Sequence, residues 1–256
     1  MFPSEAALVP RAARLAGAAA RVRAGGLTAN WLKAVALAAM ALDHFASGFL
    51  CAGSVEWIVL RTLGRLTMPI MCFFVAEGFY HTSNLRRYAR RLFCFALLSH
   101  LPFTHYFGLD PTAETSVLWG LLLGLLALAV WERRSLPLAV RLLLAALLAA
   151  LSTPADWGYI GVFWILAFGT LRDRPAAKLW AFTAVGLACY LLPVAPELVQ
   201  NPAAWLLYGY RLGFLLPIPL LAAYHGAQGR RNPALKWGFY AFYPLHLLIL
   251  SLLQRF

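Results

Sequence analysis

Residues 31–51 have the sequence WLKAVALAAMALDHFASGFLC, an apolar run that contains one Asp-His pair. A helix needs about 20 mostly apolar residues to cross a bilayer, and this run meets that length. Its Leu- and Ala-rich pattern lacks the alternation of a barrel strand, so a helix is the spanning structure that fits. The run is too long for a cleavable signal peptide and contains Asp43 and His44, which excludes that alternative.

The rest of the 256-residue chain has the same character, with 62% hydrophobic and 12% charged residues. Soluble domains have about 45–50% apolar and about 25% charged residues. The composition therefore excludes a soluble enzyme, a disordered chain and a fibrous repeat, and it predicts an all-α polytopic membrane protein with about nine transmembrane helices. The weakest span is residues 159–171, which we expect to be tilted, broken or partly inserted. The nine predicted spans are residues 31–51, 57–80, 90–107, 116–131, 136–151, 159–171, 178–193, 204–224 and 236–253.

The formal net charge of +12 reflects 22 Lys and Arg against 10 Asp and Glu. Most of the basic residues lie before the first span or in every second connection, and the connections between these contain no Lys or Arg. The positive-inside rule then predicts a cytoplasmic N-terminus and, with nine spans, a periplasmic C-terminus. Membrane orientation thus explains the positive charge, and we expect no nucleic-acid partner. Residues 1–26 are predicted to be a basic cytoplasmic segment, helical on the membrane surface or disordered, and residues 27–256 a single transmembrane domain.

Several ionisable residues lie inside the predicted spans. An Arg at mid-membrane costs at least ~2.5–3.5 kcal/mol on insertion scales, so such residues normally face a polar interior. At 1.5 Å per residue, most of them converge between the middle and the outer side of the membrane, whereas Glu77 lies near the cytoplasmic end. We therefore predict one polar cavity, with Glu77 at a different mouth. The embedded residues are Asp43, His44, Arg61, Arg65, Glu77, His100, Arg211 and His246.

Two interpretations of these residues remain open. Asp43 and His44 form either a buried pair that holds helices together or a catalytic base with its carboxylate. Because adjacent residues are about 100° apart on a helix, Asp43 has an Arg of another span as an alternative partner. The arginines form either a structural network with Asp43 or an anion site for a substrate or an acyl-donor phosphate.

Other motifs are weaker. No set of His, Cys, Asp and Glu has the spacing of a metal site, so no metal is expected. The four cysteines lie in apolar runs without CxxC spacing, which favours packing. Pro69 is expected to kink the second span, and Pro217 with Pro219 to interrupt the eighth.

Motifs at both ends of the chain resemble the TraX family of membrane proteins. The first span resembles that family's opening signature in Leu32-Lys33, Met40, Asp43 and His44. The similarity covers about residues 31–253. Its motifs are strong at both ends, and the middle of the chain carries few distinctive residues. It continues through residues 60–65 (LRTLGR), Pro69, residues 77–79 (EGF), Thr82, Asn84 and Tyr88, and returns at residues 224–226 (YHG), Lys236, Phe239-Tyr240 and residues 242–247 (FYPLHL).

The resemblance implies an acetyltransferase of the bacterial inner membrane, because TraX is associated with acetylation of the amino terminus of F-type pilin. The Asp-His pair also resembles that of the wider transmembrane acyltransferase group containing heparan-alpha-glucosaminide N-acetyltransferase, in which an embedded histidine is catalytic and cytosolic acetyl-CoA is the donor. This carry-over makes His44 the catalytic base or an acetyl carrier, and Asp43 its partner. The implied cavity residues are Arg61, Arg65, Glu77, Tyr243 and His246, beside His100 and Arg211 from the embedded set.

The expected acceptor is an amine or hydroxyl of pilin or of a cell-envelope glycan or lipid. Residues 100–104 (HLPFT) depart from the family pattern, which has acidic residues before Leu-Pro and after Phe, and His225 replaces an Asn. These departures leave a non-pilin acceptor open. A transporter or flippase of an anionic lipid-linked or glycan substrate is the alternative function, and an assembly scaffold with structural charges is a third.

Overall fold

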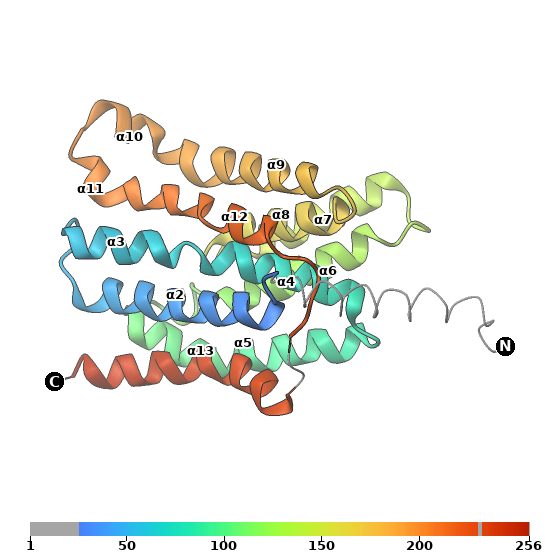
Figure 1. The fold of residues 1–256 in the computed structure, drawn as a ribbon, viewed down its shortest axis with the longest axis horizontal. Helices are drawn as coiled ribbons and strands as arrows, with labels where there is room; N and C mark the ends of the chain where they lie inside the picture. The colour runs from blue at the N-terminus through green and yellow to red at the C-terminus, as the bar shows by residue number, and fades with distance from the viewer. Residues whose placement is uncertain (1–25, 230–231, 256) are drawn as a thin grey trace.

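The computed structural model describes residues 26–229 and 232–255, and within them the chain is all-α, as predicted. Nine helical segments in these residues run back and forth along one axis (Figure 1). The predicted basic segment lies outside the described residues except for Gly26. The segments are α2 (Ala29–Phe49); α3 (Val55–Gly64) with α4 (Thr67–His81); α5 (Leu85–Phe107); α6 (Val117–Trp131); α7 (Leu138–Leu151); α8 (Gly158–Thr170); α9 (Pro175–Gly186) with η2 (Leu187–Leu191), η3 (Leu192–Val194) and α10 (Ala195–Gln200); α11 (Ala204–Tyr208) with η4 (Gly209–Leu215) and α12 (Pro217–Ala222); and α13 (Pro233–Leu253).

Four of the described helical stretches are long and apolar enough to cross a membrane: Ala29–Phe49, Val55–His81, Pro175–Gln200 and Ala204–Ala222. Shorter apolar helices fill the space beside them. This pattern is that of a multi-pass membrane protein. Successive segments run antiparallel, so the basic connections gather at the end of the bundle where α2 begins and α4 ends (Figure 1).

The segment predicted to be the weakest span is an unbroken helix, α8. It packs against α4 and α6, and its side chains Val162, Trp164 and Ile165 are fully buried. Of the three expected irregularities, a break in the helix is not found in this segment. Its low polarity and short length suit an interior position, where neighbouring helices cover it on most sides.

Proline produces the irregularity predicted for the second span. Pro69 has no N–H to donate to the carbonyl of Arg65, and the helix is interrupted at Arg65–Leu66, between α3 and α4. The N–H groups of Arg65 and Leu66 instead bond to carbonyls three residues back, at 3.2 and 3.1 Å. The eighth segment is likewise interrupted, by the 3₁₀ stretch η4 before Pro217.

Helix α2 lies between α3 and α4 on one side and α13 on the other (Figure 1). Gly64 permits the close approach of α3, because a Cβ at this position would collide with the side chain of Asp43. Asp43 and His44 are buried on different flanks of α2, Asp43 toward α3 and His44 toward α13.

Candidate active site

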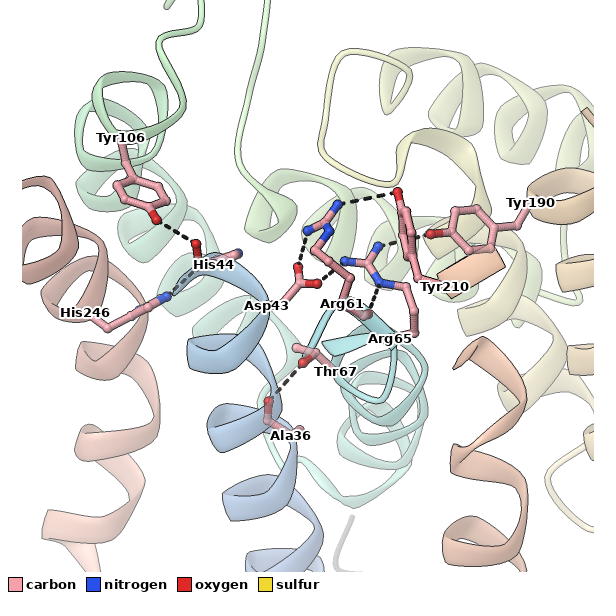
Figure 2. Close-up of polar contacts among 10 residues, drawn as sticks. All are labelled: Ala36, Asp43, His44, Arg61, Arg65, Thr67, Tyr106, Tyr190, Tyr210 and His246. Carbon is pink, nitrogen blue, oxygen red and sulfur yellow. Dashed lines mark hydrogen bonds and ion pairs between the residues drawn. The ribbon is translucent and has the colours of Figure 1, made fainter. Parts of the chain in front are cut away.

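His44 forms a hydrogen-bonded pair with His246 of α13. The His44 Nδ1 and His246 Nε2 atoms are 2.7 Å apart, and the two ring planes are nearly parallel, 12° apart, with centroids 5.0 Å apart. The Tyr106 hydroxyl donates to the His44 carbonyl oxygen at 2.6 Å, which fixes α5 against α2 (Figure 2). Both imidazoles are buried, so three helices hold the orientation of this histidine pair.

The hydrogen bonds of His246 determine which His44 nitrogen is basic. His246 Nδ1 lies 2.8 Å from the Phe242 carbonyl oxygen, and a carbonyl only accepts, so Nδ1 carries the proton. In a neutral His246, Nε2 then accepts, and His44 Nδ1 is the donor in the pair. This leaves the lone pair of His44 on Nε2, which is the arrangement that a general base requires.

Asp43 pairs with two arginines rather than with His44. Arg61 NH1 donates to Asp43 Oδ2 at 2.8 Å, and Arg65 NH2 donates to Asp43 Oδ1 at 2.5 Å. We call these three residues the arginine cluster. Figure 2 shows it on the opposite side of α2 from the histidine pair. The sequence left two possible partners for Asp43, His44 or an arginine of another span, and the structure has the arginines. His44 pairs with His246 instead.

Aromatic residues from three segments of the chain enclose the arginine cluster. Arg65 donates to the Tyr190 hydroxyl at 3.0 Å, and Arg61 donates to the Tyr210 hydroxyl at 3.4 Å. The Arg65 guanidinium also lies 4.8 Å from the ring centroid of Trp157. Such faces stabilise a buried cation and replace part of its lost hydration. Tyr190 lies in the π-helical turn η2 and Tyr210 in η4, so both irregular stretches contribute to the enclosure.

Arg211 lies beside the cluster but does not bond to Asp43. Its NH1 group donates to the Tyr190 carbonyl oxygen at 2.9 Å, and its guanidinium lies 4.8 Å from the centroid of the Tyr190 ring. Its Nε atom is buried without a hydrogen-bond partner among the described residues. The third arginine thus connects to the cluster through Tyr190.

Asp156, in the connection between α7 and α8, is a second acid close to the cluster. Burial raises its pKa to about 6. The positive charges of Arg65 and Arg61 oppose this rise, and the negative charge of Asp43 adds to it. The Asp156 carboxyl has a pKa of about 6 in the folded protein and about 4 in the unfolded chain, so the folded state binds its proton more tightly. The free energy of unfolding should therefore fall as pH rises from about 4 to about 6 and then level off. Thermal unfolding in detergent across that range tests this, and Asp156→Asn should remove this part of the slope. An unchanged slope in the variant would contradict the assignment.

A cavity of about 780 Å³ connects the end of the bundle that carries the basic connections with the neighbourhood of His44. Lys33, Arg91 and the exposed Ser83 line it at that end, and Met40 and Tyr243 line it deeper. Tyr243 contacts the His44 ring edge-on, with centroids 6.3 Å apart. The cavity therefore ends one side chain away from the histidine pair.

Of the residues predicted to share one polar cavity, Tyr243 lines this cavity, whereas Arg61, Arg65, Arg211 and His246 do not. Two others lie away from both clusters. Glu77 is at the opposite end of α4 from the arginine cluster, 3.8 Å from His81, and interacts electrostatically with Lys178. His100 Nε2 lies 2.9 Å from the Pro111 carbonyl oxygen and ties α5 to the connection after it. Neither contacts the histidine pair. Among the described residues, no group of three His, Cys, Asp or Glu is placed to hold a metal ion.

A family model described as TraX protein matches residues 28–254. The chain belongs to the TraX family. It is also 34% identical, over 88% of its own length and 95% of the relative's, to a protein of Dichelobacter nodosus named "Probable fimbrial assembly protein FimC, serogroup H1". No solved structure matches the chain.

The TraX match includes both sides of the site, from α2 to α13. The sequence singles out the charged and histidine residues of the two clusters but not Tyr106, Tyr190 and Tyr210, whose hydroxyls bond to them. Single tyrosines in apolar runs are common at membrane interfaces, so their spacing gave no signal of a buried role.

Proposed function

We propose that the chain is an integral-membrane acetyltransferase. It moves an acetyl group from cytosolic acetyl-CoA to an amine or hydroxyl of a pilin or another envelope acceptor, with His44 as general base. The main support for this proposal is the cavity, which runs from the basic end of the bundle to Tyr243, whose ring packs against a buried histidine with Nε2 set as the acceptor. Family membership and the fimbrial relative supply the class of acceptor.

The basic end of the cavity suits the phosphates of the donor. Lys33 and Arg91 line it, and both side chains are cations that bind phosphate oxygens. By the positive-inside rule this end faces the cytoplasm, where acetyl-CoA is available. The volume of the cavity lies within the range of about 300–1,000 Å³ that is usual for small-molecule sites. Beyond the cations the wall is mostly apolar, including Leu37, Met71 and Phe74, which suits the pantetheine arm.

The histidine pair supplies the acid–base chemistry. His44 Nε2 takes the proton of the acceptor amine or hydroxyl as that group attacks the thioester carbon, and then returns the proton to the departing thiolate. His246 holds the tautomer through Phe242 and hydrogen-bonds to the imidazolium side of His44. His100 lies away from this pair, so the departure from the family pattern at residues 100–104 leaves the base and the cavity intact.

Lys33→Gln should raise the KM for acetyl-CoA about tenfold and leave kcat nearly unchanged, because it removes a charge-assisted bond to a phosphate and nothing at the reacting carbon. The measurement is the initial rate of label transfer from radiolabelled acetyl-CoA to a peptide with a free pilin amino terminus. Lys178→Gln is the matched control: both ammonium groups lie 4.9 Å from a Phe ring centroid, but Lys178 does not line the cavity. Equal KM values for the two variants would contradict the donor path.

A further inference from the structure

The hydroxyl of Tyr243 is buried at the deep end of the cavity without a partner. The residue is 4% exposed, and its O–H group has no acceptor in the part of the chain that the structure describes. Leaving a buried hydroxyl unbonded costs about 1–3 kcal/mol, and most such groups in folded proteins have a partner. Tyr243 lines the cavity, so a ligand in the cavity is placed to supply that partner.

The amino end of α6 lies at the same place. Val117 and Leu118 line the cavity, and the backbone N–H of Val117 points to the Tyr243 oxygen, so it supports that hydroxyl and leaves the O–H hydrogen for a ligand. The first N–H groups of a helix have no partner within it, and the helix dipole favours negative charge there. Ser116, the N-cap residue, makes no side-chain cap bond, and its buried Oγ has no partner among the described residues. The amino end of α6 therefore favours a developing negative charge at the deep end of the cavity.

Tyr243 lies beside the proposed base. The Tyr243 ring is 6.3 Å from the His44 ring and 5.6 Å from the His246 ring, measured between centroids. Tyr243 and His246 are three residues apart on α13 and so lie on the same face. A carbonyl group held at the deep end of the cavity thus lies at the Tyr243 side chain, against which the ring of the proposed base His44 packs.

We propose that the Tyr243 hydroxyl and the amino end of α6 form the oxyanion site for the donor thioester. This inference rests on the proposed acetyltransferase function and adds a catalytic residue to it. As the acceptor bonds to the carbonyl carbon, the C=O electron pair moves to oxygen, and Tyr243 donates to that oxyanion. His44 takes the acceptor proton. When the intermediate collapses, the C–S bond breaks and the thiolate leaves with that proton, giving an amide or ester and free CoA.

Tyr243→Phe tests the role with the ring retained. Removing one oxyanion donor costs about 10²–10³ in rate, so kcat should fall by that factor while the KM for acetyl-CoA changes less than about threefold. Tyr159→Phe is the control, because it makes the same substitution on a half-exposed ring of α8 outside the cavity and should keep the wild-type rate. A kcat within about threefold of wild type for Tyr243→Phe would overturn the proposal.

Infrared spectroscopy gives a readout that needs no turnover. The probe is acetonyl-CoA, a ketone analogue labelled with ¹³C at its carbonyl. In wild type the C=O stretch should move to lower frequency on binding, and in Tyr243→Phe most of that shift should vanish with binding retained. Bound analogue without a shift would refute the oxyanion site alone. No transfer and no binding by wild type would refute the proposed function as well, so the two failures are distinguishable.

Discussion

Replacing His44 with Gln should reduce acetyl transfer by about 10²–10⁴, the range that a positioned general base contributes. Gln presents an amide that can still donate to His246 Nε2, so the hydrogen bond that holds α2 to α13 has a substitute. What disappears is the basic nitrogen. The measurement is the initial rate of label transfer from radiolabelled acetyl-CoA at saturating donor, with wild type and variant compared at equal folded concentration.

Binding of acetyl-CoA is the control for this variant. Because the donor is held mainly at Lys33 and Arg91, the dissociation constant measured by calorimetry should change little in His44→Gln. A loss of rate without a loss of binding locates the defect in the chemical step. Transfer within about threefold of the wild-type rate would remove His44 from the role of base.

Asp43→Ala should cost about 3–5 kcal/mol of stability, the usual result of removing one partner from a buried ion pair. Both carboxylate oxygens are used, so the change leaves Arg61 and Arg65 without their counter-charge in a region that α3 and α2 shield from water. Chemical denaturation in detergent measures the loss. Asp43→Asn with Arg61→Gln removes one charge of each sign and should recover a large part of it.

The same double variant separates two roles for Asp43. Since Asp43 bonds to arginines and not to His44, the account predicts that the double variant, once folded, transfers acetyl within about tenfold of wild type. A double variant that is stable but inactive would show that Asp43 acts on the chemistry directly, as the family resemblance alone implies.

The spans and the kink were predictable because they depend on local chemistry. Apolar run length determined the helices, and the missing N–H of Pro69 determined the interruption at Arg65–Leu66. The convergence of Asp43, Arg61 and Arg65 also followed from depth, since the first two spans are adjacent in the chain and a short connection makes them antiparallel neighbours.

The histidine pair was not predictable in the same way. His44 and His246 are 202 positions apart, and their contact depends on α13 packing beside α2, which hydropathy does not encode. The unpartnered hydroxyls of Tyr243 and Ser116 were not predictable either. The first depends on the rotation of α13, and the second on the absence of a side-chain capping bond at the start of α6.

Reconstitution into liposomes of known orientation tests the central claim most directly. Radiolabelled acetyl-CoA is supplied on one face only, with two acceptors on the other face, a peptide carrying a free pilin amino terminus and glucosamine. The account predicts label transfer when acetyl-CoA is on the face of the basic connections, and none with His44→Gln. Transfer only from the opposite face, or no transfer to either acceptor together with anion flux in the absence of acetyl-CoA, would contradict it.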